Sequence, residues 1–91
     1  MSDPASTGNA EFVTAAAEVK NLACKPSNEE LLELYALFKQ SIVGDNTTAA
    51  PGMFDLQGKA KWGAWEKVKG TSKEDAQKKY IALVKQLQTK N

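Results

Sequence analysis

The sequence predicts an all-α protein: a four-helix bundle in an up-down-down-up arrangement, with a long crossover loop between the second and third helices. Three observations support this fold class. Apolar residues recur at helical spacing in four segments, capping and turn residues separate those segments, and no segment alternates like a strand. The chain has 91 residues, 42% of them hydrophobic and 25% charged, which suits one small globular domain.

The first helix is expected close to residue 10. Residues 1–9 are small and polar, so we expect them to form a flexible leader before a domain that spans 10–91. From Glu11 onward the apolar residues predict a helix to about Ala23, where Lys25-Pro26 stops it. The apolar positions of this helix are Phe12, Ala15, Ala16, Val19, Leu22 and Ala23.

The second helix is predicted over about Ser27 to Val43. Ser27 and Glu30 have the spacing of a capping box, in which each side chain binds the other residue's backbone N–H. The apolar residues cover more than one stripe, so this helix should contact other elements on two sides. They are Leu31, Leu32, Leu34, Leu37, Phe38, Ile42 and Val43.

The crossover loop comprises residues 44–57, with turn residues near both ends and no period of its own. Fourteen residues reach at most ~46 Å, whereas the second helix is only ~25 Å long. The loop can therefore return along the whole bundle, which makes the second and third helices parallel. The joints around Lys25-Pro26 and Gly70-Thr71 are short and make their helices antiparallel.

The third and fourth helices fill the basic half of the chain. We expect the third over about Gly58 to Lys69, ended by Gly70. Thr71 or Ser72, paired with Glu74 or Asp75, should cap the fourth, which runs to about Gln88. Its apolar face consists of Ala76, Tyr80, Leu83, Val84 and Leu87.

The charges are unevenly distributed although the net charge is only +1. Residues 1–55 carry three lysines and eight acids, whereas residues 56–91 carry nine lysines and three acids. This asymmetry indicates an anion bound by one face. The absence of Arg argues against sequence-specific nucleic-acid binding. No segment approaches the ~20 apolar residues of a membrane span.

Composition also argues against catalysis and metal binding. The chain has no His, and its single cysteine, Cys24, has no partner for an internal disulfide or a catalytic pair. Cys24 is interpreted as structural. With no apolar signal stretch at the N-terminus, the chain is expected in the cytoplasm. The predicted activity is therefore binding, with no catalytic residue, metal or cofactor.

Two short segments combine aromatic rings with lysines. In GKAKWGAWEKVKG, residues 58–70, Trp62 and Trp65 lie three apart, so at least Trp65 should be buried while most lysines face solvent. In YALFKQ, residues 35–40, Tyr35, Phe38 and Lys39 are neighbours on a helix. That patch is either a binding site or a core Phe beside a snorkelling Lys.

Four segments together resemble the acyl-CoA-binding protein family. They are FVTAAAEVKNL, KPSNEELLELYALFKQSIVGD, PGMFDLQGKAKWGAWEKVKGTSKEDA and KKYIALV, and the resemblance covers residues 11–88. It implies a cytoplasmic four-helix bundle that binds medium- and long-chain fatty acyl-CoA esters with high affinity and carries them, without being an enzyme. It also implies a monomer that binds no nucleic acid, does not insert stably in membranes, and serves enzymes that make and use acyl-CoA.

The resemblance also implies roles for individual residues. Lys39 and Lys61 match lysines that bind the 3′-phosphate of the CoA ribose, and Tyr35 matches a tyrosine that assists them. Phe38 stands where many members have Tyr, and Gln57 stands where others have a lysine near the nucleotide. The remaining implied ligand-binding residues are Lys20, Leu31, Leu32, Ala36, Leu37 and Tyr80.

Two other classes of function are compatible with parts of the sequence. The basic C-terminal half could serve as an interaction module for nucleic acid or an anionic membrane surface, which the low net charge and the absence of Arg disfavour. A small acyl-transfer enzyme would need an activated nucleophile, and the sequence offers none.

Overall fold

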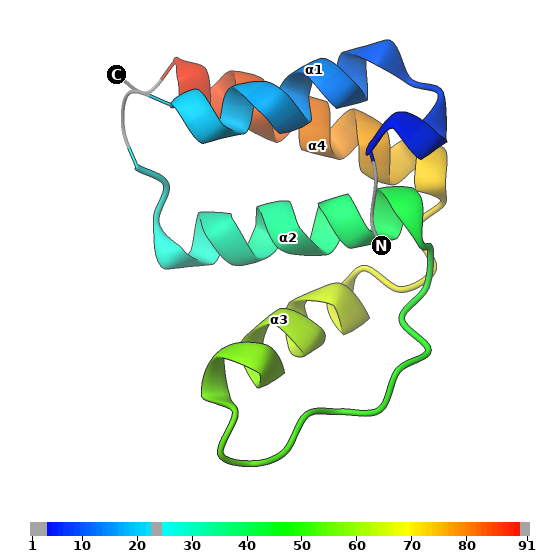
Figure 1. Cartoon of the computed structure of the whole chain (residues 1–91), viewed down its shortest axis with the longest axis vertical. Helices are drawn as coiled ribbons and strands as arrows, with labels where there is room; N and C mark the ends of the chain where they lie inside the picture. The colour runs from blue at the N-terminus through cyan, green and yellow to red at the C-terminus, as the bar shows by residue number, and fades with distance from the viewer. Residues whose placement is uncertain (1–3, 23–24, 90–91) are drawn as a thin grey trace.

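A computed structural model describes residues 4–22 and 25–89. Figure 1 shows that α1 and α4 run in one direction and α2 and α3 in the other, which confirms the predicted up-down-down-up bundle. These residues contain no strand. Predictions for Cys24 and for a helix end at Ala23 lie outside the described residues. The elements are η1 (Pro4–Thr7), α1 (Ala10–Glu18), η2 (Val19–Asn21), α2 (Asn28–Ile42), α3 (Leu56–Lys67) and α4 (Lys73–Gln88).

The first α-helix is shorter than the sequence indicated. Asn9 caps it, because the Asn9 side chain accepts a hydrogen bond from the N–H of Phe12 at 3.2 Å. After Glu18 the chain tightens into the 3₁₀ turn η2, and Leu22 is already extended. The apolar spacing therefore continues past the point where α-helical hydrogen bonding stops, as is common at helix ends. The boundary of the domain near residue 10 stays a prediction.

The predicted capping box at the start of α2 is confirmed. The N–H of Ser27 donates to the Glu30 carboxylate at 2.9 Å, and the N–H of Glu30 donates to the Ser27 hydroxyl at 3.2 Å. At the start of α4, the N–H of Asp75 donates to the hydroxyl of Ser72 at 3.1 Å. Both caps satisfy backbone donors that the first turn of a helix leaves unpaired.

The predicted start of α3 at Gly58 was wrong by two residues. Asp55 is the N-cap, and its carboxylate accepts the N–H of Gly58 at 2.9 Å, so the helix begins at Leu56. The helix ends at Lys67, with Val68 as its C-cap, rather than at Lys69. Gly70 has a φ of 92°, a left-handed conformation that favours glycine and turns the chain towards α4.

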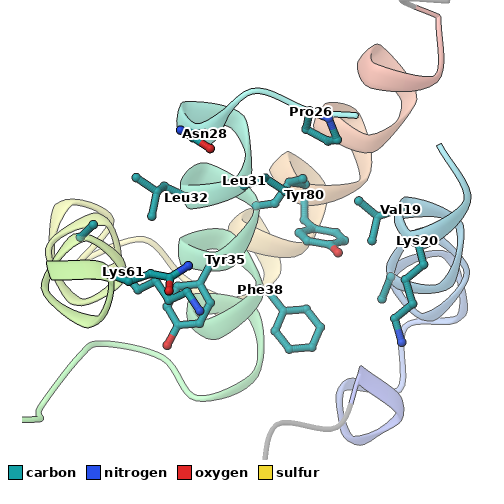
Figure 2. Close-up of a pocket in the computed structure, with 14 residues that line it drawn as sticks. Val19, Lys20, Pro26, Asn28, Leu31, Leu32, Tyr35, Phe38, Lys61 and Tyr80 are labelled. Carbon is teal, nitrogen blue, oxygen red and sulfur yellow. The ribbon is translucent and has the colours of Figure 1, made fainter. Parts of the chain in front are cut away.

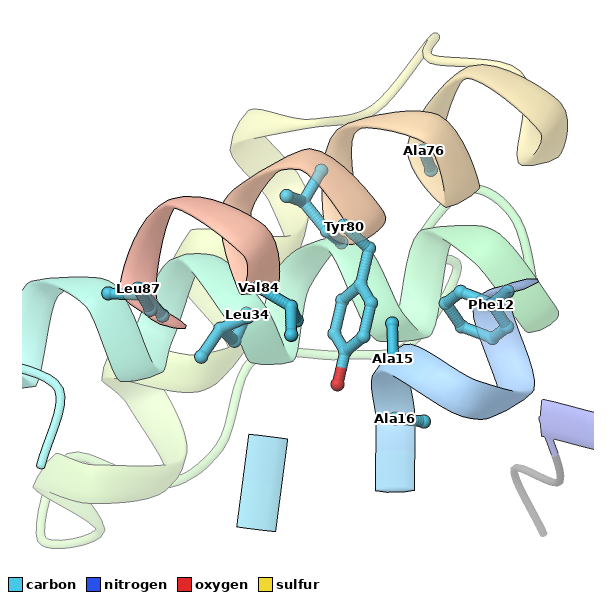
Figure 3. Packing of buried hydrophobic residues seen from close by; sticks show 9 residues of the cluster. Phe12, Ala15, Ala16, Leu34, Ala76, Tyr80, Val84 and Leu87 are labelled. Carbon is cyan, nitrogen blue, oxygen red and sulfur yellow. The ribbon is translucent and has the colours of Figure 1, made fainter. Parts of the chain in front are cut away.

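The hydrophobic core lies between α1, α2 and α4 (Figure 3). α2 also packs against α3 on its other side, as its broad apolar surface predicted. Among the described residues, α3 contributes one buried side chain, Trp65. The core residues are Phe12, Ala15, Ala16, Leu34, Leu37, Ala76, Tyr80, Val84 and Leu87.

Hydrogen bonds from Trp65 and Gln40 attach α3 to α2. The Trp65 indole N–H donates to the carbonyl of Gly44 at 2.8 Å and to the side-chain oxygen of Gln40 at 3.2 Å. The Gln40 amide donates to Asp45 at 2.8 Å and to the carbonyl of Thr71 at 2.6 Å. Trp65 is 7% exposed, which confirms the prediction that it is buried.

The crossover loop is attached to both of its neighbouring helices. Asp45 accepts a hydrogen bond from the N–H of Gly70 at 2.9 Å, and this bond with that from Gln40 lowers the pKa of the Asp45 carboxyl. Farther along, the indole N–H of Trp62 donates to the carbonyl of Thr48 at 3.0 Å. Each tryptophan therefore uses its indole N–H to fix the loop.

Within the described ranges, none of the helices combines the length and the apolar character that crossing a lipid bilayer requires.

Candidate functional site

A large cavity lies between α2, the end of α1 with η2, the first half of α3 and one residue of α4. Its volume of about 820 Å³ is in the range of small-molecule sites. Figure 2 shows an apolar floor from α2, aromatic rings, and lysines approaching from opposite sides. It is lined by Ala16, Val19, Lys20, Pro26, Asn28, Leu31, Leu32, Leu34, Tyr35, Phe38, Gln57, Ala60, Lys61 and Tyr80.

One face of α2 supplies the floor of the cavity. Leu31, Tyr35 and Phe38 have the spacing that places residues on the same side of a helix. Leu31 is 41% exposed, whereas Tyr35 and Phe38 on the same side of the helix are half-buried. The exposed leucine gives the cavity an apolar surface that a ligand can cover.

Two lysines are placed over aromatic rings between α2 and α3. The Lys61 ammonium of α3 lies 5.5 Å from the centre of the Tyr35 ring of α2. In the reciprocal arrangement, the Lys39 ammonium of α2 lies 5.8 Å from the centre of the Trp65 ring of α3. Such cation–π contacts hold an ammonium with ~0.5–1 kcal/mol and leave it able to bind an anion. Lys61 lines the cavity and Lys39 does not.

Phe38, an aromatic residue of the cavity, packs against two buried aromatic rings. The ring of Phe38 lies 5.8 Å from that of Phe12 and 6.0 Å from that of Tyr80, and the last two are 5.0 Å apart. Because Tyr80 is desolvated by burial, its pKa is raised from 10.0 to about 12. Tyr80 lines the cavity, where its phenol hydroxyl can serve as a hydrogen-bond donor.

The structure brings most of the implied ligand-binding residues to one place. Those lining the cavity are Lys20, Leu31, Leu32, Tyr35, Phe38, Gln57, Lys61 and Tyr80. Ala36 and Leu37 are 1% and 4% exposed and lie in the interior instead. Lys39 lies over Trp65, so the neighbours Tyr35 and Lys39 face different partners on α3.

Sequence reasoning missed six residues that line the cavity. Ala16 and Val19 precede Lys20 by one turn and by one residue, and α1, which packs against α4, carries them to the cavity. Pro26 and Asn28 flank the N-cap of α2, and Ala60 precedes Lys61. Leu34 was predicted only as an apolar position of the second helix. The six are Ala16, Val19, Pro26, Asn28, Leu34 and Ala60.

Metal ligands are not clustered in residues 4–22 and 25–89. These ranges contain no group of three or more His, Cys, Asp or Glu side chains placed to hold an ion.

An all-α bundle with an apolar cavity bordered by ammonium groups defines a small helical ligand-binding domain. The family model described as Acyl CoA binding protein matches residues 9–84, and the chain belongs to this family. It is 67% identical over 76 residues to acyl-CoA-binding protein homolog 1 of Caenorhabditis elegans, covering 84% of this chain and 88% of that one. Identity to the Drosophila melanogaster homolog is 58% over 80 residues, covering 88% and 93% of the two chains.

A solved structure agrees with this assignment. The crystal structure of acyl-CoA-binding protein 2 from Oryza sativa superposes with a TM-score of 0.81 at 49% identity, covering 85% of this chain and 86% of that chain. The family and the fold expected from the sequence are therefore confirmed.

Proposed function

We propose that this protein binds medium- and long-chain fatty acyl-CoA esters with high affinity and carries them as a cytoplasmic pool. The observation that supports this most directly is the cavity of about 820 Å³, which places an apolar floor beside lysines. An acyl-CoA ester has the matching composition, because it joins an apolar tail to a nucleotide that carries several phosphates. The names of the similar proteins support the same ligand.

The acyl tail is assigned to the apolar floor around Leu31 and Leu32 of α2. Each buried methylene contributes about 0.8 kcal/mol, so a tail of ~12 methylenes contributes on the order of 10 kcal/mol before the costs of association. The exposed Leu31 is then a contact surface for the ligand. Tail burial supplies most of the affinity, which makes affinity depend on chain length.

The nucleotide is assigned to the aromatic and cationic side of the cavity. Lys61 and the hydroxyl of Tyr35 bind the ribose 3′-phosphate, joined by Lys39 once it leaves the Trp65 ring. Each charge-assisted hydrogen bond contributes about 1.5 to 3 kcal/mol. Adenine stacks on Phe38, a contact that contributes roughly 1 to 3 kcal/mol for bases on aromatic rings.

Three further residues are assigned to the rim of the site. Lys20 lines the cavity on the side opposite Lys61, where it meets the pyrophosphate or the nucleotide. Tyr80 donates its hydroxyl, and Gln57 offers an uncharged amide in place of a cation. We assign no residue a catalytic role, and the protein acts as a monomer that exchanges its ligand with enzymes that make or use acyl-CoA.

Titration calorimetry with a long acyl-CoA, free CoA and the free fatty acid tests the proposal. We expect tight binding of the acyl-CoA, much weaker binding of CoA and little binding of the fatty acid. Equal affinities for acyl-CoA and CoA would refute it, because tail burial would then contribute nothing. Binding with a steep salt dependence but no chain-length dependence would instead indicate an interaction module for nucleic acid or an anionic membrane surface.

A further inference from the structure

Large apolar side chains are most exposed where the crossover loop meets α3. Among the described residues, the highest values are those of Phe54 at 95%, Leu56 at 77% and Met53 at 71%. We call Met53, Phe54 and Leu56 the apolar tip. Figure 1 shows the loop and the first turn of α3 on the side of the molecule opposite α1 and α4. The three side chains therefore contribute little to the fold although they are large and apolar.

The backbone that carries the apolar tip is held by hydrogen bonds. The Asp55 N–H donates to the carbonyl of Gly52 at 3.0 Å, and the Asp55 carboxylate accepts the N–H of Gly58 at 2.9 Å. The indole of Trp62 fixes the loop at Thr48. These bonds present the side chains outward and direct the one acid of the segment, Asp55, towards the positive end of α3.

The apolar tip borders the candidate ligand cavity. Gln57 follows Leu56 directly and lines that cavity, as do Ala60 and Lys61 on the next turn of α3. Because α2 and α3 are parallel, the exposed Leu31 lies near the corresponding end of α2. A surface that contacts the tip would thus lie next to the cavity.

We propose that the apolar tip inserts into the surface of an anionic lipid bilayer. Phe, Leu and Met beside lysine is the composition of segments that bind at the membrane interface. Lys59 is exposed and lies one helical turn from Leu56, and α3 as a whole carries three lysines and one acid. The cations favour an anionic headgroup over a zwitterionic one.

The size of the tip favours a bilayer over a protein partner. A stable protein interface buries ~800 Å² on each partner, whereas even large aromatic side chains bury only ~150–250 Å² each. Three side chains on a convex loop fall short of that area, but they suffice for reversible insertion between lipids. Docking would also bring the cavity to the bilayer for exchange of acyl-CoA. This role in exchange rests on the proposed function, whereas docking itself does not.

Vesicle flotation with the full-length, ligand-free protein tests this inference. The double substitution Phe54→Ser and Leu56→Ser should weaken binding to vesicles of phosphatidylcholine mixed with phosphatidylserine by roughly tenfold or more. Lys59→Gln should weaken it by roughly fivefold, and only when phosphatidylserine is present. Val43→Ser is the matched control, since Val43 is 49% exposed at the opposite end of α2, and its binding should equal that of the wild type.

Several outcomes would overturn the docking proposal. One is wild-type protein that does not float with anionic vesicles, and another is equal flotation of the wild type and the double variant. Sedimentation that shows a wild-type dimer absent from the double variant would assign the tip to a second copy of the chain. A loss of acyl-CoA affinity by the double variant in vesicle-free solution would place the tip in the ligand site instead.

The two proposals fail separately. The tip residues do not line the cavity, so the double variant should bind acyl-CoA in solution as the wild type does. If the wild type binds no acyl-CoA yet floats in a tip-dependent manner, the proposed function fails and the docking proposal stands. If acyl-CoA binds and flotation is absent, the reverse holds.

Discussion

Replacing Lys61 by methionine should lower the affinity for an acyl-CoA ester by about 5- to 30-fold. The magnitude follows from two contacts of the same ammonium. In the ligand-free protein it lies 5.5 Å from the Tyr35 ring centre, a contact of ~0.5–1 kcal/mol that ends when the phosphate binds. A charge-assisted hydrogen bond contributes about 1.5 to 3 kcal/mol, so the difference is about 1 to 2 kcal/mol. Methionine retains an apolar stem of similar length, which limits the loss to the charge.

The assay is calorimetry with two ligands, a long acyl-CoA and its 3′-dephospho analogue. If Lys61 binds the ribose phosphate, Lys61→Met should weaken the first ligand and leave the second nearly unchanged, as in a double-mutant cycle. Lys67→Met is the matched control, because Lys67 is exposed on the same helix and does not line the cavity. Equal losses for the two ligands would refute the assigned role.

Three other predictions concern single residues elsewhere in the fold. Trp65→Phe removes the donor to Gln40 and Gly44, so it should lower the free energy of unfolding by about 2 to 4 kcal/mol. Denaturant titration followed by circular dichroism measures this, and a loss under about 1 kcal/mol would contradict the role of these hydrogen bonds. Asp45→Asn should destabilise the protein at neutral pH. Because the folded-state pKa of Asp45 is lowered, the difference in unfolding free energy between wild type and variant should vanish as pH falls below 3.8, and a constant difference in acid would contradict this role of Asp45. The pKa of Tyr80 is raised to about 12, so its neutral form stabilises the fold below pH 10.0 and this contribution is lost as pH rises towards 12. The phenolate absorbance step at about 12 should be missing in Tyr80→Phe, and a step that persists would belong to another tyrosine.

Local signals in the sequence were sufficient for most of the fold. The Ser27 and Ser72 caps, the helical spacing of apolar residues and the length of the crossover loop predicted the helices and their directions, because each depends on few neighbouring residues. The end of α1 and the start of α3 were less well predicted. A change from α to 3₁₀ hydrogen bonding leaves the apolar spacing almost intact, and Asp55 lies in a segment that also contains turn residues.

The site was harder to predict because it depends on how the helices meet. Most of the residues that the family resemblance implied gather around the cavity, but Ala16 and Val19 reach it through the packing of α1 against α4. Helical spacing placed Tyr35 beside Lys39, yet it could not show that Lys39 lies over Trp65 while Lys61 lies over Tyr35. The contribution of each residue to ligand binding stays a prediction.

The attachment of α3 has a consequence for the motions of the protein. None of the buried residues of the core cluster lies on α3, whose one buried side chain, Trp65, bonds to Gln40 of α2 and Gly44 of the loop. Segments with few buried apolar contacts open locally at lower free energy than the whole domain. Backbone amides of α3 should therefore exchange with deuterium earlier than those of α4 in the ligand-free protein. A molecule bound between α2 and α3 would act as a brace, and the delay in α3 exchange would report its occupancy.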